Sequence, residues 1–244
     1  MITLKEPAET IYVWRNVHLN RSRTLLFFTI LVLAFMLFVM STFPFAQLGL
    51  LLLPLSYGLG VYTYRKMMVW RMGSYGEKKV VSALSSLDDR FLLVNNVVIP
   101  PNWGDADHII ISPNGLYVVE TKTVGDVVEC DGDSWRRIKV SKGGFSYPVP
   151  VGNPGRQAKR NAKSLKDLLL KHEFDIFKGG APHIWVHAVV CFTSDVVQLK
   201  VRKPTVEVLT PDSLVAYVTR QHLDRQYTAE ELRLMGEVIL RECG

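Results

Sequence analysis

The chain has 244 residues, enough for one ordinary domain plus an appendage or for two small domains. Its net charge of +6 suits an anionic partner, such as nucleic acid or the inner face of a membrane. The 3 cysteines lie far apart in sequence and form no Cys/His ligand cluster, which argues against a zinc site and against a fold built on disulfides.

The first predicted elements are two membrane-spanning helices. No charged residue or histidine occurs in residues 24–64. This stretch contains two apolar runs, residues 25–40 and 48–64, separated by a polar and proline-containing break at 41–44. Since a bilayer core needs about 20 apolar residues per helical span, we predict a transmembrane helical hairpin over residues 24–64.

Basic residues flank this hairpin on both sides: Arg15, Arg21 and Arg23 precede it, and Arg65, Lys66 and Arg71 follow it. Cytoplasmic flanks of membrane spans are enriched in Lys and Arg, so both ends are predicted to be cytoplasmic in a multi-pass inner-membrane protein. A re-entrant hairpin and a buried helical hairpin of a soluble oligomer remain as alternatives. Residues 1–23 form an N-terminal cytoplasmic segment, either interfacial or an exposed tail.

Residues 65–73 form a basic connector, and residues 74–244 form one predicted α/β domain. Apolar periodicity predicts its first helix over 74–87, with Ser74 as the N-cap. Further helices are predicted over 153–172, 210–221 and 228–243, the last opened by a capping box of Thr228 and Glu231. Strands are predicted over 91–99, 107–112, 116–123, 127–130, 135–140, 184–192 and 206–209.

A predicted hairpin at Asn114-Gly115 gathers charged residues on one face of the sheet. A two-residue Asn-Gly loop would pair Asp107 with Lys122, whereas a longer loop or a shift of the same parity would pair Asp107 with Glu120. Side chains alternate between the two faces of a strand. In either register, one face therefore carries Asp105, Asp107, Glu120 and Lys122.

This charged face has the composition of a divalent-cation site. The carboxylates of Asp107 and Glu120 and the backbone carbonyl of Thr121 form an oxygen set suited to Mg²⁺ or Mn²⁺. Such a cation activates water and neutralises a phosphodiester, and Lys122 would stabilise the transition state. The alternative is a cross-strand salt-bridge ladder, because a Glu-x-Lys pair alone is common on solvated sheets.

Several spaced motifs resemble one family: Gly76-Glu77, Asp107-His108-Ile-Ile-Ile-Ser, Gly115-Leu-Tyr-Val-Val-Glu120-Thr-Lys122, Trp135, and Asn153-Pro154-x-x-Gln157. Over residues 73–190 the chain is similar to the nuclease-related domain, NERD, which is itself similar to the PD-(D/E)xK nucleases. The resemblance implies a mixed-sheet PD-(D/E)xK nuclease-like core and a metal-dependent nuclease. It also implies the roles of five residues: a central triad of Asp107, Glu120 and Lys122, Glu77 as an additional acid, and Gln157 as an auxiliary polar residue.

The helix predicted over 153–172 carries a stripe of basic residues at i, i+3, i+4 spacing, namely Arg156, Lys159, Arg160, Lys163 and Lys166. Arg136 and Arg137 follow Trp135 in a predicted strand. Both groups are predicted to contact nucleic acid through its phosphates, with stacking by an aromatic ring. A solvated helix face and contact with anionic lipid are the alternatives for the stripe.

The sequence therefore predicts a membrane-anchored, Mg²⁺- or Mn²⁺-dependent nuclease that hydrolyses phosphodiester bonds at the cytoplasmic membrane face, with DNA favoured over RNA. Attack on incoming DNA and DNA processing are roles that would suit it. Two alternatives are a non-catalytic nucleic-acid-binding module and a structural subunit of a membrane assembly, in which the hairpin would form a homo-oligomer.

Overall fold

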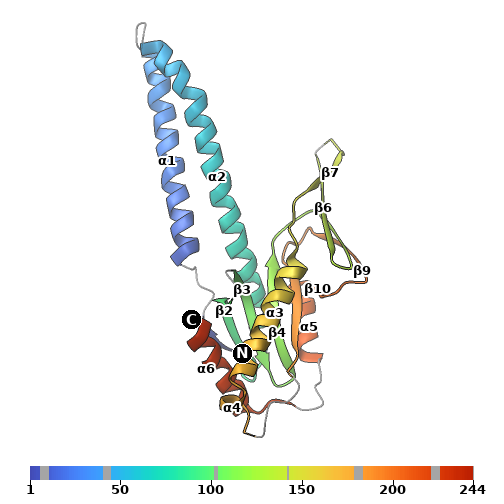
Figure 1. Ribbon diagram of the computed structural model, residues 1–244. Coiled ribbons are helices and arrows are strands. Elements are labelled where there is room, and N and C mark those ends of the chain that lie inside the picture. The colour runs from blue at the N-terminus through green and yellow to red at the C-terminus, as the bar shows by residue number, and fades with distance from the viewer. Residues whose placement is uncertain are drawn as a thin grey trace. The chain divides into compact units, whose positions relative to one another are not determined.

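The computed structural model describes residues 1–5, 11–40, 45–101, 104–141, 143–178, 184–220 and 226–243. The chain divides into two compact units (Figure 1). One unit is Glu9–Tyr75, and the other combines Met1–Ala8 with Gly76–Gly244. The predicted break at 41–44 lies outside the described residues.

The first unit is a pair of long helices, α1 (Ile11–Met40) and α2 (Phe45–Leu84), of which α2 continues into the second unit. Both helices are long and apolar enough to cross a membrane. In their most apolar windows only 11% and 17% of the residues are buried, so most of their apolar side chains face outward. A core helix of a soluble protein would bury that surface.

Two contacts hold these helices together. The hydroxyl groups of Thr24 and Thr63 lie 2.9 Å apart and are buried. Gly49 lies directly against the backbone of α1, because a Cβ atom there would come within 2.7 Å of the Ala34 carbonyl oxygen and of the Phe38 nitrogen. Small residues allow such close helix packing. Because lipid provides no hydrophobic effect between helices, close packing and hydrogen bonds drive helix association there.

The basic connector at 65–73 is helical. It is part of α2, which runs unbroken to Leu84, so the prediction that Ser74 caps a new helix is wrong. The connector consists mostly of Lys, Arg, Met and other residues that favour helix. Their helix propensity outweighs the weak N-cap signal of one serine.

The larger sheet of the α/β unit has the strand order β1-β2-β3-β4-β8-β10. Its strands are β1 (Ile2–Lys5), β2 (Leu92–Val98), β3 (Asp105–Ser112), β4 (Gly115–Lys122), β8 (Val186–Phe192) and β10 (Glu207–Leu209). β2, β3 and β4 pair antiparallel, whereas β1 pairs parallel with β2, and β8 pairs parallel with both β4 and β10. This mixed sheet confirms the predicted α/β fold class.

Helices cover both faces of the larger sheet. On one face α3 (Pro154–Lys171), α4 (Glu173–Ile176) and α6 (Ala229–Cys243) share a buried core that includes Ile109 of β3. On the other face, the end of α2 and α5 (Pro211–Arg220) pack around Tyr117 of β4. The capping box is confirmed: the Thr228 backbone N–H donates to Glu231 Oε2 at 2.8 Å, and the Glu231 N–H donates to Thr228 Oγ1 at 3.2 Å.

A smaller sheet has the order β7-β6-β5-β9, made of β5 (Val127–Asp131), β6 (Ser134–Val140), β7 (Ser146–Val149) and β9 (Gln198–Arg202). β7 and β9 are short, polar strands that the sequence did not predict. The ring of Trp135 joins this sheet to the rest of the unit, since it packs 6.1 Å from the ring of Phe192 and against Gly155 at the start of α3.

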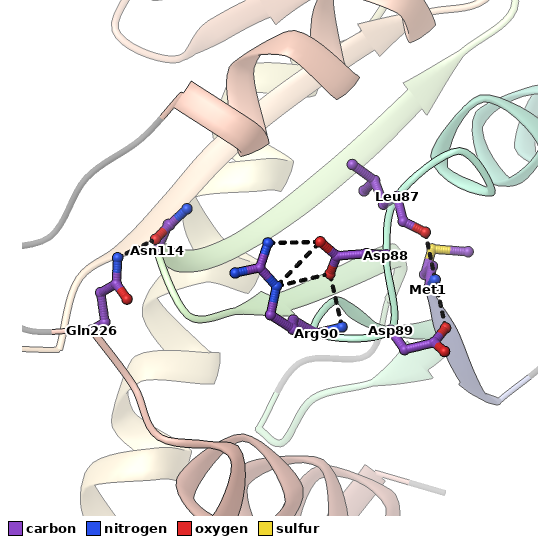
Figure 2. Close-up of polar contacts among 7 residues, drawn as sticks. All are labelled: Met1, Leu87, Asp88, Asp89, Arg90, Asn114 and Gln226. Carbon is purple, nitrogen blue, oxygen red and sulfur yellow. Dashed lines mark hydrogen bonds and ion pairs between the residues drawn. The ribbon is translucent and has the colours of Figure 1, made fainter.

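The first residues of the chain belong to the α/β unit. Residues 2–5 were predicted to belong to the N-terminal segment, whereas they form β1 of the larger sheet. The Met1 ammonium donates to the Leu87 carbonyl and lies 3.1 Å from Asp89 Oδ1 (Figure 2). Figure 2 also shows the neighbouring bonds of Arg90 to Asp88 and of Gln226 to Asn114.

Candidate functional site

The β3–β4 hairpin determines which charged residues face each other. Its Cα partners run from Ser112–Gly115 to His108–Val119, so Pro113 and Asn114 form the turn and Asp107 comes opposite Glu120. The register with Asp107 opposite Lys122 is therefore wrong, and the alternative of the same parity is the one observed. Ser112 Oγ closes this turn by donating to the Gly115 carbonyl at 3.0 Å.

Asp107 is a half-buried carboxylate at the beginning of β3. Its Oδ2 accepts a hydrogen bond from the backbone N–H of Thr121 at 2.6 Å. Burial raises the pKa of Asp107 well above its usual range, and the nearby charges of Glu120 and Glu77 raise it further. A cation bound beside this carboxyl group would replace its proton and stabilise the ionised form.

Glu120 is 2% exposed and has two different oxygen environments. Its Oε1 accepts a hydrogen bond from Lys122 Nζ at 2.6 Å, whereas its Oε2 is buried and has no hydrogen-bond partner among the described residues. Burial raises the pKa of Glu120, against the opposing effect of Lys122. A buried carboxylate oxygen without a partner is costly, so this atom marks a place for a ligand.

Glu77 reaches the same area from the last turns of α2. Its Oε2 accepts a hydrogen bond from Asn96 Nδ2 at 3.0 Å, and burial raises its pKa, with a further rise from Asp105. Asn96 has a φ of 50° and interrupts the β2–β3 pairing, because Asn95 and Val97 pair with β3 and Asn96 does not. The positive φ of Asn96 occurs at the residue whose side chain bonds Glu77, without a shift in the β2–β3 register.

The beginning of α3 contributes polar groups from one helix face. Asn161 is buried, and its Nδ2 donates to the Asp105 carbonyl at 3.0 Å. The positive charge of Arg160 lowers the pKa of Glu120, which places its guanidinium near that carboxylate. Gln157 is half-buried and lies one helical turn before Asn161, on the same face of α3.

The donor set fits a hard divalent cation. Asp107 and Glu120 supply carboxylate oxygens, one of which has no partner. The Lys122 carbonyl accepts from Thr193 N of the β8 side at 3.1 Å, so the preceding Thr121 carbonyl faces the β3 side, where Asp107 lies. Within the described residues no three His, Cys, Asp or Glu side chains converge closely enough to hold a metal ion. A cation here would therefore rely on two carboxylates, the Thr121 carbonyl and water.

The basic residues predicted to bind nucleic acid divide into several groups. Arg160 faces the acidic site, and Arg156 is exposed. Lys159 is paired with Asp133, and Lys163 with Asp167 at 2.6 Å. In the smaller sheet Arg137 bonds Asp126, whereas Arg136 is exposed. The basic stripe is therefore not one continuous free surface.

Asn96 and Asn161 were not predicted from the sequence as site residues. Both position acidic groups, Asn96 through the Glu77 carboxylate and Asn161 through the Asp105 backbone. An asparagine has no sequence signal for such a role, except that Asn161 follows Gln157 at i+4. His108 lies on the opposite face, and its Nδ1 is 2.6 Å from Asn95 Oδ1.

Comparisons with known proteins identify a family for the chain. The model of the nuclease-related domain family, NERD, matches residues 72–193. Over 156 residues, 62% of this chain, the sequence is 32% identical to a Streptomyces coelicolor protein described as the probable kinase PglW, and covers 9% of it. Over 104 residues, 41% of the chain, it is 31% identical to an uncharacterised Bacillus anthracis protein, and covers 47% of it.

The chain thus spans less than half the length of each of these two relatives. No solved structure matches. The family match covers half of the chain and includes α2 from its last turns, the β3–β4 hairpin, and α3, which together carry the acidic site. The chain belongs to the nuclease-related domain family.

Proposed function

We propose that this protein is a membrane-anchored, Mg²⁺- or Mn²⁺-dependent nuclease that hydrolyses phosphodiester bonds, with DNA favoured over RNA. The observation that carries the proposal is the Glu120 carboxylate. It is buried, bonded to Lys122 at one oxygen and without a partner among the described residues at the other, and it lies opposite a second, half-buried carboxyl, Asp107.

Each residue of the site then has a distinct task. Asp107, Glu120 and the Thr121 carbonyl would hold the cation, which when bound supplies Lewis-acid activation and charge neutralisation. The Lys122 side chain is 27% exposed, so its ammonium group can bond Glu120 and still present a positive charge to an incoming phosphate. Glu77, with a raised pKa, is suited to hold a proton near the site, and Gln157 would orient water or phosphate.

The test is cleavage of a fluorescent DNA substrate by the full chain in detergent, with Mg²⁺, with Mn²⁺ or with a chelator. Cleavage should require the metal, and Glu120→Gln should reduce it about 100-fold or more. Glu129→Gln is the matched control, because Glu129 also pairs with a lysine, Lys200, at 3.3 Å but belongs to the smaller sheet. Equal inactivity of wild type and both variants on DNA and RNA would contradict the proposal, and binding without cleavage would favour a binding module.

We further propose that the helices cross the inner membrane twice and leave the nuclease domain in the cytoplasm. β1 precedes α1 and pairs with β2, which follows α2, so the segments on either side of the helical pair share one sheet. Backbone pairing cannot form through a bilayer, so this pairing supports a place on the same side for both segments and argues against a single crossing. The flanking arginines and lysines favour the cytoplasm for that side.

Cysteine labelling tests this topology. The native Cys130, Cys191 and Cys243 are buried and should give little background. With a membrane-impermeant maleimide, cells that carry Gln47→Cys, at the start of α2, should be labelled while intact. Cells that carry Lys171→Cys, at the end of α3, should be labelled only after lysis. Labelling of Lys171→Cys in intact cells would contradict the proposed orientation.

A further inference from the structure

A groove of about 420 Å³ lies beside α3, lined mainly by Lys159, Lys163, Lys166, Trp185, His187 and Tyr217. It is separate from the acidic site. Residues advance by about 100° each around a helix, so Lys159 and Lys163 leave α3 about 160° away from Asn161, which bonds the acidic site. The two flanks of one helix therefore carry two different surfaces.

Trp185 gives this groove an exposed aromatic face. The side chain is 55% exposed, although tryptophan is strongly buried on average. Lys166 Nζ lies 6.0 Å from the centroid of its ring, within the range of a cation–π contact. A flat ring beside an ammonium group matches a nucleobase joined to a phosphate.

The charge of α3 also suits a polyanion. The helix contains six Lys or Arg residues and one acidic residue, Asp167. The ion pairs of Lys159 with Asp133 and of Lys163 with Asp167 are exposed, and such pairs contribute only about 0–1 kcal/mol. A phosphate can therefore compete for these ammonium groups, while Glu207 on the groove wall is a single opposing charge.

We propose that this groove binds a single-stranded segment of nucleic acid, with a base stacked on Trp185 and backbone phosphates at Lys163 and Lys166. The inference that the groove lies on the path of a substrate to the acidic site rests on the proposed nuclease function. An unpaired strand is the form that fits, because only an unstacked base can place its face on a protein ring. A concave, aromatic-lined surface favours this ligand over a flat lipid surface.

Strand β8 connects the groove to the acidic site. Val186 at one end of β8 lines the groove, and Val190 farther along β8 pairs with Glu120. Four residues of strand correspond to about 13 Å, or about four stacked nucleotides at about 3.4 Å each. A strand held at Trp185 would thus reach Glu120 only if it is at least about this long.

The test measures binding of a fluorescent oligothymidylate of about 12 nucleotides to the full chain in detergent with chelator, by anisotropy. Trp185→Ala should weaken binding about 10-fold or more, and Trp185→Phe should largely retain it. Phe174→Ala is the matched control, since Phe174 is 83% exposed on α4, outside the groove. Affinity for a duplex of the same length should be equal in all four proteins. Lys166→Gln, on the helix, provides a second variant that should reduce the salt dependence of strand binding.

Two further measurements separate the explanations. Hydrolysis of bis(p-nitrophenyl) phosphate needs only the acidic site, so it should be unchanged in Trp185→Ala. If wild type hydrolyses neither this diester nor DNA, while Trp185→Ala still loses strand binding, the nuclease proposal is contradicted. The proposal that the groove binds a single strand is then still supported. Equal strand affinity of wild type, Trp185→Ala and Lys166→Gln would contradict the proposal that the groove binds a single strand. So would a short-chain phosphatidylserine that displaces the strand from wild type but not from Trp185→Ala, because that result would assign Trp185 to a lipid headgroup.

Discussion

Asp107→Asn is expected to abolish metal-dependent cleavage and, at the same time, to make the metal-free protein more stable at neutral pH. Asp107 is half-buried beside Glu120, and desolvation and the charge of Glu120 raise its pKa. An amide removes this charge and can still accept the hydrogen bond from Thr121 N. Cleavage should fall about 100-fold or more, because half of the carboxylate pair that would hold the cation is lost.

The pH dependence of stability follows from the same shift. A carboxyl group with a raised pKa in the folded state binds a proton more tightly when folded. Its stabilising contribution is therefore complete below the unfolded pKa of about 3.9 and is lost as pH rises through the higher folded pKa. This contribution to stability should fall as pH rises from about 4 toward neutrality in metal-free wild type, and Asp107→Asn should lack it, so the variant gains stability relative to wild type over that range. Glu77 and Glu120 have the same sign, so part of the slope remains.

Thermal unfolding of the full chain in detergent, across pH and with or without Mg²⁺, checks this prediction. Mg²⁺ should raise the Tm of wild type more than that of Asp107→Asn. Asp126→Asn is a contrasting control, since Asp126 accepts from Arg137 Nε at 2.6 Å and its loss should destabilise by about 1–3 kcal/mol. A lower Tm for metal-free Asp107→Asn than for wild type at neutral pH would show that Asp107 belongs to a stabilising polar network instead of a cation site.

Gly76→Ala is expected to destabilise the α/β unit and to reduce cleavage, although alanine ordinarily stabilises a helix by about 1 kcal/mol relative to glycine. A Cβ atom at Gly76 would come 1.9 Å from Thr123 Oγ1 and 2.8 Å from Thr193 Oγ1. These hydroxyl groups bond each other at 2.8 Å at the ends of β4 and β8, so neither moves freely. The end of α2 would have to shift, at a cost of about 1–3 kcal/mol, and it would carry Glu77 with it.

Gly73→Ala supplies the matched control on the same helix, because nothing lies within 4 Å of a Cβ atom there. Its Tm should equal or exceed that of wild type. Adding Thr123→Ala to Gly76→Ala should recover stability, since it removes the atom that is struck, and the double-mutant cycle gives the coupling between the two positions. If Gly76→Ala matches Gly73→Ala in Tm and cleavage, then the close approach of α2 does not position Glu77.

The features that the sequence determined depend on local patterns. The uncharged stretch at 24–64 indicated two apolar helices, because hydropathy needs no knowledge of neighbours. The capping box at Thr228 involves atoms three residues apart. The common face of Asp107, Glu120 and Lys122 follows from strand alternation alone, and it holds in either register.

The tertiary structure decided the contacts between distant segments. Periodicity could not distinguish between the two hairpin registers. In the observed register the turn lies at Pro113-Asn114, and the Ser112 side chain bonds across it. Nor could periodicity show that residues 2–5 pair with β2, about 90 positions later. The bond between Glu77 and Asn96 likewise joins the end of α2 to β2. The two flanks of α3 differ because Asp133 and Asp167 pair with lysines on one of them. These contacts depend on how the sheet and helices pack. That packing results from many core residues acting together, so no local pattern in the sequence indicates it.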